Sequence, residues 1–203
     1  MFTGIVTDLG LLTDVRAHNE VRTLTIASGH DPAGVEIGAS ICCSGVCLTV
    51  TSATSGGPLR ALFTFDAAPE TLAVTTVAGW EPGRRINLER ALGIGAELGG
   101  HLVTGHVDAA IGLVAREDFA QTSRFTFEAP DSLARFIATK GSVCLDGTSL
   151  TVNRVEGNRF TCLLIPHTLA VTSWGAAQVG DPVNLEVDMM ARYAARLAEF
   201  PRA

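Results

Sequence analysis

The sequence lacks an excess of basic residues. It holds 15 Lys and Arg against 21 Asp and Glu, which gives a formal net charge of −6. Clustered Lys and Arg supply most of the affinity of proteins for nucleic-acid phosphates. The composition therefore argues against nucleic acid as a partner.

Long apolar segments are also missing. The chain contains no run of 18 uncharged apolar residues, so no transmembrane helix and no membrane partner are expected. It starts MFTGIVTDLG, without the basic residues and apolar core of a signal peptide. We therefore expect a cytoplasmic protein.

Motifs for metals and nucleotides are absent too. The five cysteines (42, 43, 47, 144 and 162) form no CxxC pair, and adjacent Cys42 and Cys43 on a strand would point to opposite faces. His101 and His106 lie five residues apart and need not converge. No GxGxxG follows a predicted strand. We expect no metal and no nucleotide cofactor.

What the sequence does contain is a repeat. SGVCLTV at 44–50 returns as DGTSLTV at 146–152, and TGIV at 3–6 returns as TGHV at 104–107. PETLAVTTV (69–77) matches PHTLAVTSW (166–174), and GRRINLE (83–89) matches GDPVNLE (180–186), in the same order. A unit of about ninety residues has the size of a complete small domain. We therefore predict a tandem duplication.

Both halves have the pattern of an all-β domain. Short segments rich in Val, Ile, Thr and Phe, such as TLTIAS and NRFTCLLI, are separated by Gly, Pro, Asp and Asn. About six strands per half favour a closed barrel, because closure removes exposed strand edges. One short helix is predicted at 131–140. The expected domains are 1–98, with a linker at about 89–99, then 99–188, and a C-terminal segment at 189–203.

The C-terminal segment has the period of an amphipathic helix. Met190, Tyr193, Leu197 and Phe200 recur at spacings of 3, 4 and 3. The helix could pack on its own domain. An oligomerisation helix is favoured, because the first half has no counterpart for this apolar stripe.

Taken together, MFTGIV, GVCLTV, GGHLVTGHVD, DGTSLTVN and the two PxTL segments resemble the riboflavin synthase family of the α-chain type. The resemblance covers the whole chain. It implies two tandem six-stranded Greek-key β-barrels plus a C-terminal α-helix that assembles a homotrimer. It also implies a dismutation, in which one 6,7-dimethyl-8-ribityllumazine gives a four-carbon unit to another. The products are riboflavin and 5-amino-6-(ribitylamino)uracil, no cofactor is used, and lumazine synthase is a further suggested partner.

The resemblance assigns two substrate pockets, one per barrel. The ribityl chains are expected to contact Glu70, Thr71 and Lys140. The first pocket is expected to use Gly4, Ile5, Val6, Cys47, Leu48, Thr49, Asp66, Ala67, Ala68, Pro69, Glu70 and Thr71. The second is expected to use Gly105, His106, Val107, Lys140, Ser149, Leu150, Thr151, Leu163, Leu164, Ile165, Pro166, His167 and Thr168.

Four residues are the catalytic candidates of the resemblance. His106 is the candidate base for the acidic 7-methyl proton of one lumazine. Ser149 and Cys47 occupy equivalent points of the two repeats. Asp188 either supports catalysis, for example by polarising Ser149, or caps the C-terminal helix.

Differences between the halves should separate the donor pocket from the acceptor pocket. The candidate pairs are Ile5 with His106, Cys47 with Ser149, and Ser44 with Asp146. His167 stands where the family usually has an acid. Phe2 either packs over a ligand or fills a barrel.

Two other functions stay open at this point. The same fold includes antenna proteins that bind a lumazine or flavin without turnover. A flavin-dependent reductase has a similar barrel, but it needs a nucleotide-binding domain for which this chain shows no motif.

Overall fold

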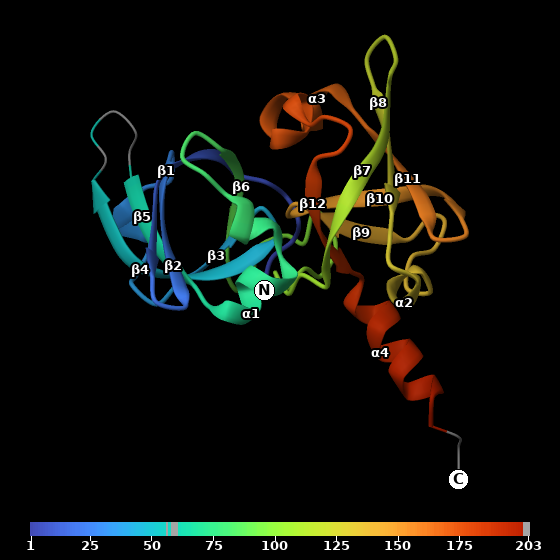
Figure 1. The fold of residues 1–203 in the computed structure, drawn as a ribbon, viewed down its shortest axis with the longest axis horizontal. Coiled ribbons are helices and arrows are strands. Elements are labelled where there is room, and N and C mark those ends of the chain that lie inside the picture. Colours follow the sequence, from blue (N-terminus) through green and yellow to red (C-terminus); the bar gives the residue numbers. More distant parts are fainter. Residues whose placement is uncertain (56, 58–60, 201–203) are drawn as a thin grey trace.

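The structure is a computed structural model that describes residues 1–55, 57 and 61–200. Residues 201–203 of the expected C-terminal segment lie outside the described part. The described residues form two β-barrels side by side and a terminal helix that projects from the second barrel (Figure 1). This arrangement confirms the predicted fold class.

Each barrel is closed and has six antiparallel strands. The order β1-β2-β5-β4-β3-β6 places β2 beside β5, which is a Greek-key connection, and β7–β12 repeat this order. The first barrel contains β1 (Asp8–His18), β2 (Val21–Ser28), β3 (Ser40–Cys43), β4 (Val46–Ser55), β5 (Ala61–Ala67) and β6 (Arg85–Arg90). The second contains β7 (Ala109–Asp118), β8 (Ser123–Glu128), β9 (Ser142–Leu145), β10 (Thr148–Glu156), β11 (Arg159–Leu164) and β12 (Pro182–Val187).

Alternating burial along the strands produces two separate cores. In β5 the inward residues include Phe63 and Phe65, while Thr64 between them is only partly buried. A fully buried tryptophan closes each core, Trp80 in the first barrel and Trp174 in the second. Each indole N–H donates to a threonine hydroxyl, as buried tryptophans require.

Several short helices follow the strands. α1 (Pro69–Val74) and α3 (Pro166–Val171) begin at the prolines of the two PxTL segments, where the sequence analysis predicted no helix. Proline suits a first helical turn because it needs no backbone donor there. Three-residue or four-residue 3₁₀ turns lie at Pro32–Gly34, Thr76–Gly79 and Ser173–Ala176.

Two predicted boundaries were wrong. The helix predicted at 131–140 covers only α2 (Asp131–Ala134), because the following backbone bonds span three residues, as in Phe136 N to Leu133 O. The linker predicted at about 89–99 starts later, because β6 runs through Glu89 to Arg90. The segment between the barrels is therefore 91–108.

Two asparagines from the repeated NLE motif join the barrels. Asn87 Nδ2 of the first barrel donates to Asp146 O at 2.9 Å, and Asn184 Nδ2 of the second donates to Ser44 O at 2.8 Å. Both asparagines are buried, so losing one would leave backbone groups unsatisfied at a cost of about 1–3 kcal/mol each. Their side-chain oxygens accept N–H groups of the opposite barrel from Ser173 and Thr76.

Phe2 also lies between the barrels. Its backbone pairs with Val103 in an isolated bridge, and its fully buried side chain packs with Cys42 and Cys144. It therefore neither covers a ligand nor fills one barrel, as the sequence analysis had considered.

Ser44 and Asp146 belong to the same interface. Both adopt a left-handed backbone conformation, with φ of 43° and 44°. Ser44 Oγ accepts from Asn87 N at 3.1 Å, and Asp146 Oδ1 accepts from Asn184 N at 2.8 Å. The expectation that this pair separates two substrate pockets was wrong, because both side chains are buried in the turns that join the barrels.

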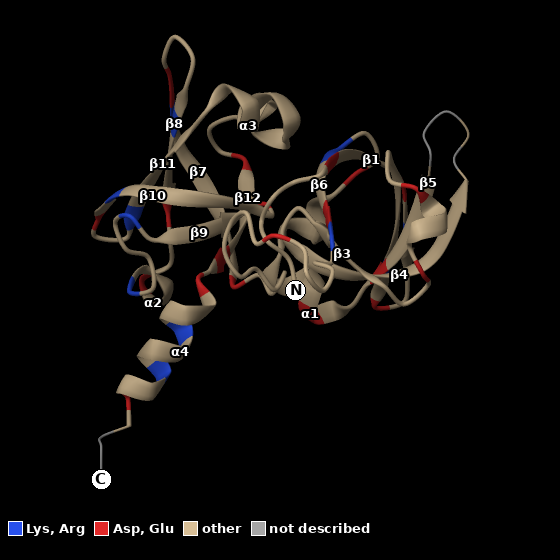
Figure 2. Ribbon diagram, turned by 180° about the vertical axis from the view of Figure 1, so that it is seen from behind, with Lys and Arg blue, Asp and Glu red and all other residues tan. Residues whose placement is uncertain are grey.

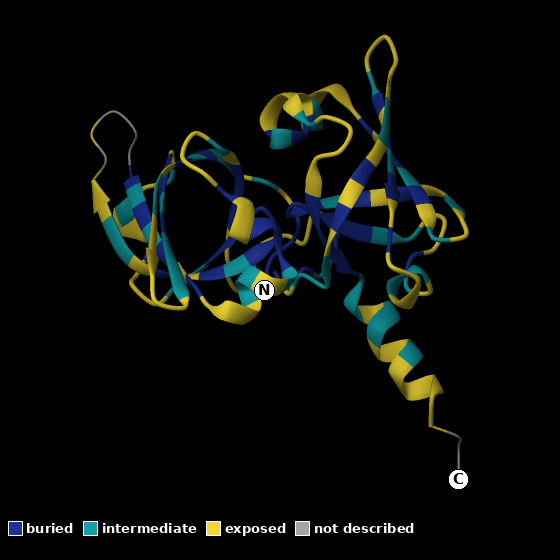
Figure 3. Ribbon diagram, viewed as in Figure 1, coloured by how far each residue is buried: buried dark blue, intermediate teal, exposed yellow. Residues whose placement is uncertain are grey.

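The terminal helix α4 (Met189–Ala198) begins at Asp188, whose carboxylate accepts from Met190 N at 2.8 Å. The N-cap role is therefore confirmed. Its apolar stripe points to solvent (Figure 3). The exposed fractions are 66% for Met190, 60% for Tyr193, 72% for Leu197 and 61% for Phe200. Among the described residues, no helix is long and apolar enough to cross a membrane.

We predict that Asp146→Ser, which installs the residue of the first repeat, removes a pH dependence of stability. Burial raises the pKa of Asp146 from 3.8 to about 7. Between these values the folded protein keeps a proton that the unfolded chain releases, so stability falls as pH rises through this window. Urea unfolding should show that the variant gains stability relative to the parent above the window but not below it. Parallel pH profiles would contradict this.

Candidate functional site

Each closed barrel has one equivalent place where the pairing of two strands stops early, which we call its opening. Pairing of β4 with β5 ends at Val50 and Phe65, although β4 begins at Val46 and β5 continues to Ala67. Pairing of β10 with β11 ends likewise at Val152 and Cys162. Beyond these points backbone edges are available to other partners.

The two openings are completed by crossed segments. Ser149 N of the second barrel donates to Gly4 O at 2.7 Å, and Cys47 N of the first donates to Gly105 O at 2.9 Å. The sequence analysis had placed 4–6 with Cys47 and 105–107 with Ser149, and the structure reverses this. Repeat position alone could not reveal the exchange, because both halves carry the same TG motif.

Only glycine fits at the two crossing points. Gly4 and Gly105 have φ of 75° and 76°. A Cβ on Gly4 would lie 2.6 Å from Ser149 Cβ, and one on Gly105 would lie 2.6 Å from Cys47 Cβ. The backbone of one half can therefore touch the strand of the other.

A buried carboxylate holds each crossing segment. Glu89 accepts from Thr3 N, Thr3 Oγ1 and Gly4 N at 2.7, 2.7 and 2.9 Å. Glu186 accepts from Thr104 N, Thr104 Oγ1 and Gly105 N at 2.8, 2.6 and 2.8 Å. Burial raises the pKa of Glu89, although these donors oppose the shift. Each segment is thus clamped to its own barrel while it contacts the other.

We call the first site the opening beside Cys47, α1 and residues 105–107. Cys47 is half-buried, Thr49 points outward, and His106 is exposed. The Asp66 carboxylate accepts from Thr23 Oγ1 at 2.7 Å. This site is polar.

We call the second site the opening beside Ser149, α3 and residues 4–6. Beside exposed polar residues such as Thr151 and His167, it has three exposed apolar side chains: Ile5 is 46% exposed, Leu163 43% and Ile165 55%. In the first site the equivalent residues are His106, Asp66 and Ala68. The two sites therefore share a backbone frame but differ in the chemistry of their walls.

Some predicted site residues face the cores. Their side chains are buried, so only their backbone groups could meet a ligand. These residues are Leu48, Ala67, Leu150 and Leu164. The pocket residues predicted in the two PxTL segments, Pro69 to Thr71 and Pro166 to Thr168, lie on α1 and α3 at the two sites.

Lys140 stands out as the only lysine in the sequence. It is exposed and has φ of 68°, whereas its counterpart Gly38 in the first repeat has φ of 91°. The backbone frame is the same, because Lys140 N donates to Val152 O and Gly38 N to Val50 O. Backbone strain of this kind concentrates at functional sites, which makes Lys140 a candidate site residue.

Sequence reasoning missed the partner of Ser149. His101 Nδ1 lies 2.7 Å from Ser149 Oγ, and His101 N is held by Thr3 O at 3.1 Å. Desolvation lowers the pKa of His101, while the charges of Asp188 and Glu186 oppose this. A neutral imidazole beside a hydroxyl can take up its proton.

The one sequence signal for this pair was the GGH tripeptide at 99–101. A Cβ on Gly100 would lie 2.1 Å from Thr3 O and 2.8 Å from Ser149 Cβ. No hydrogen bond joins Asp188 to Ser149 among the described residues, and the Asp188 charge acts on His101 by raising its pKa against the desolvation.

The buried cysteines are unreactive. Burial raises the pKa values of Cys42, Cys43 and Cys144 well above the usual range, and that of Cys162 to about 12. Within the described part of the chain, no group of three His, Cys, Asp or Glu residues could hold a metal ion.

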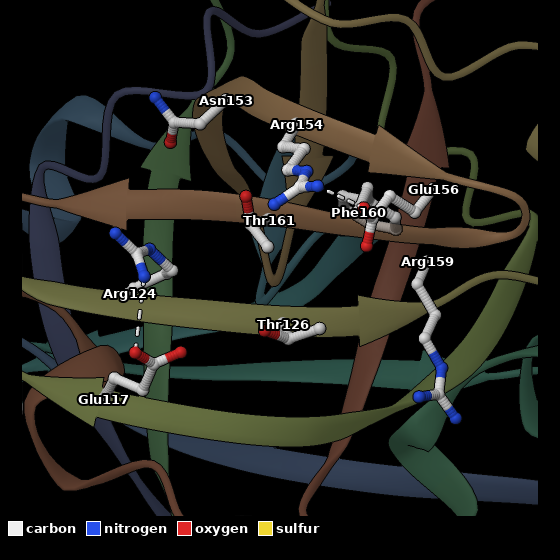
Figure 4. Close-up of a pocket in the computed structure, with 9 residues that line it drawn as sticks. All are labelled: Glu117, Arg124, Thr126, Asn153, Arg154, Glu156, Arg159, Phe160 and Thr161. Carbon is white, nitrogen blue, oxygen red and sulfur yellow. Dashed lines mark hydrogen bonds and ion pairs between the residues drawn. The ribbon is translucent and has the colours of Figure 1, made fainter.

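A concavity of about 430 Å³ lies on the outer face of the second barrel (Figure 4). Its arginines are paired with glutamates: Arg124 with Glu117 at 3.3 Å, and Arg154 with Glu156. Asn153 at its edge accepts from Leu163 N at 2.6 Å. We interpret it as an ion-paired sheet surface rather than a ligand pocket.

Comparisons with known proteins agree with this geometry. The family model described as "Lumazine binding domain" matches twice, at residues 3–91 and 104–188. The fold resembles crystal structures of LumP complexed with riboflavin (TM-score 0.83, 20% identity, 92% of this chain and 99% of that chain) and with 6,7-dimethyl-8-(1'-D-ribityl) lumazine (TM-score 0.80, 20% identity, the same coverage).

Curated relatives match over nearly their full lengths. The riboflavin synthase of Brucella abortus is 53% identical over 202 residues, covering 100% of both chains. That of Mycobacterium bovis is 42% identical over 200 residues (97% of this chain and 98% of the relative), and that of Bacillus subtilis is 34% identical over 196 residues (97% and 89%). With two lumazine-binding domains and relatives of this similarity, the chain belongs to the riboflavin synthase family.

Proposed function

We propose that this protein converts two molecules of 6,7-dimethyl-8-ribityllumazine into riboflavin and 5-amino-6-(ribitylamino)uracil. The observation that carries the proposal is the pair of openings with one backbone frame and different reactive side chains. A reaction between two copies of one substrate needs two sites of matching shape. Because donor and acceptor play different roles, it also needs sites of different chemistry.

Holding two substrates together makes a bimolecular encounter effectively intramolecular, which is worth up to about 7–11 kcal/mol. The two sites of one chain do not face each other, however. α1 and α3, which flank the first and second sites, lie on opposite sides of the molecule, α1 at the lower edge and α3 at the upper edge of the views in Figures 1 and 2. We therefore infer that the facing sites come from two chains.

Binding would combine backbone and side-chain contacts. Strand-edge N–H and C=O groups can pair with the ring carbonyls and nitrogens without placing a charge there. In the second site, Ile5 and Leu163 offer apolar surface to the ring. Lys140 is suited to the ribityl chain of that site, and Glu70 with Thr71 to that of the first.

For the chemistry, His106 would remove the 7-methyl proton of one lumazine, leaving an anion delocalised over the ring. Ser149 would activate the other lumazine at ring carbon 7, with His101 as the group that receives its proton. Cys47, at the equivalent point of the first site, would contact the ring there. Asp188 would act at a distance, by favouring protonation of His101.

The exposed apolar stripe of α4 supports assembly into a homotrimer. Large exposed apolar patches mark interaction surfaces. Ion pairs of Arg135 with Glu199 at 3.3 Å and of Arg192 with Asp108 at 2.7 Å connect the helix segment to its own barrel and leave the stripe uncovered. An association with lumazine synthase and a cytoplasmic location stay predictions from the sequence.

We predict that the pure protein forms riboflavin from the lumazine alone, without any cofactor. His106→Gln and His101→Gln should each lower turnover by about 10²-fold, because each removes a proton acceptor, while lumazine binding changes little. Riboflavin absorbance measures turnover, and the exposed His18→Gln is the matched control. A bound but unchanged lumazine would indicate an antenna protein, and turnover only with NAD(P)H a reductase.

We predict that Lys140→Gly raises the stability of the fold but weakens the binding of lumazine. Glycine relieves the left-handed strain at this position and should stabilise the fold by up to about 1 kcal/mol. Binding of lumazine, measured by fluorescence titration, should weaken at one of the two sites. Unchanged binding at both sites would exclude Lys140 from the second site.

We predict that Leu197→Lys disrupts the assembly, because it places a charge in the apolar stripe. Ala198→Lys adds the same charge at the neighbouring position and is the control. Light scattering should show a lower mass only for Leu197→Lys, together with lower turnover. A variant that is monomeric and fully active would contradict the inference that the facing sites come from two chains.

A further inference from the structure

One carboxylate joins three elements next to the first site. Asp108 Oδ1 and Oδ2 accept from the Arg192 guanidinium of α4 at 2.7 and 2.8 Å. Asp108 Oδ2 also accepts from Val187 N at the end of β12, at 2.9 Å. Asp108 follows His106 by two residues, so this pair connects the helix directly to the segment that carries the candidate base.

The repeat provides an internal comparison. Thr7 is the counterpart of Asp108, and both make the same backbone bond, from Thr7 N to Leu88 O and from Asp108 N to Leu185 O. The Thr7 hydroxyl bonds locally, to Leu88 O at 3.2 Å. At this position of the repeat, a carboxylate thus occurs only in the second half, which α4 follows.

The two crossing segments are consequently held differently. Residues 4–6 are fixed by one carboxylate, Glu89, before Ile5, and by the uncharged bonds of Thr7 to Leu88 O after Val6. Residues 105–107 are fixed from both sides, by Glu186 before His106 and by Asp108 after it. His106 is exposed between these two anchors, where a small rotation of the backbone would move its imidazole.

The space around His106 is shared with the helix. A pocket of about 410 Å³ is lined by His106, Val107, Glu186, Met189, Arg192 and Tyr193. The Asp108 side chain is only 10% exposed, while that of Arg192 is 40% exposed. Both partners of the ion pair line this pocket, and the arginines of α4 are visible as blue bands in Figure 2.

We propose that Arg192 is a positioning residue of the first site: through Asp108 it sets His106 relative to α4, so that assembly through the helix and placement of the base are coupled. The inference rests on the proposed function. It goes beyond it by assigning a role in catalysis to a helix that would otherwise only hold subunits together.

The test compares two ion pairs of the same helix. Arg192→Gln breaks the pair with Asp108, and Arg135→Gln breaks the pair with Glu199 near the other end of α4. If Arg192 positions His106, Arg192→Gln should lower kcat for lumazine about tenfold or more, since small displacements of a reacting group are costly. KM and the mass by light scattering should change little. Arg135→Gln should keep kcat within about twofold.

Further variants keep the test decisive. Asp108→Thr installs the residue of the first repeat and should lower kcat as Arg192→Gln does. The kcat of the double variant should be no lower than that of the less active single variant, because both changes break the same ion pair. Arg192→Lys should restore part of kcat. Equal kcat in Arg192→Gln and Arg135→Gln, or a loss that only follows dissociation, would overturn the proposal. Absence of turnover in the unmodified protein would instead refute the proposed function.

Discussion

The two buried carboxylates Glu89 and Glu186 are the constraint on which the sites depend. Each accepts two backbone N–H groups and a hydroxyl from a TG segment, and each fixes that segment where its glycine carbonyl meets the strand of the other barrel. A buried carboxylate is costly unless it is hydrogen-bonded, so the segment and the carboxylate stabilise each other. Neither barrel can form its site without the other half of the chain.

The crossing of the two TG segments between the barrels explains how the two repeats came to differ in their site chemistry while they kept the same backbone geometry. The shared elements are those that carry backbone geometry: the glycines at the crossing points, the clamping glutamates and the asparagines between the barrels. The residues that differ are side chains on the walls. Ser149 has a histidine partner from the linker, whereas Cys47 receives a segment from the second half whose next residue is His106.

Much of this was predictable from the sequence, and particular residues show where prediction failed. The repeat and the strand pattern predicted both barrels, and the stripe from Met190 to Phe200 predicted an exposed helix face. Ser44 and Asp146 were misread because sequence difference does not distinguish a pocket wall from a buried interface. The helices at Pro69 and Pro166 were not predicted, because six residues are too short for a periodic signal.

The sequence by itself determined the repeat, the strand content and the family, because these depend on local residue pattern and on motif spacing. Only the tertiary structure decided which half completes which site, that His101 rather than His106 meets Ser149, and that Asp108 links His106 to α4. The physical reason is that these are contacts between distant segments with equivalent local sequences. Their pairing is chosen by the packing of one barrel against the other, which no local pattern encodes.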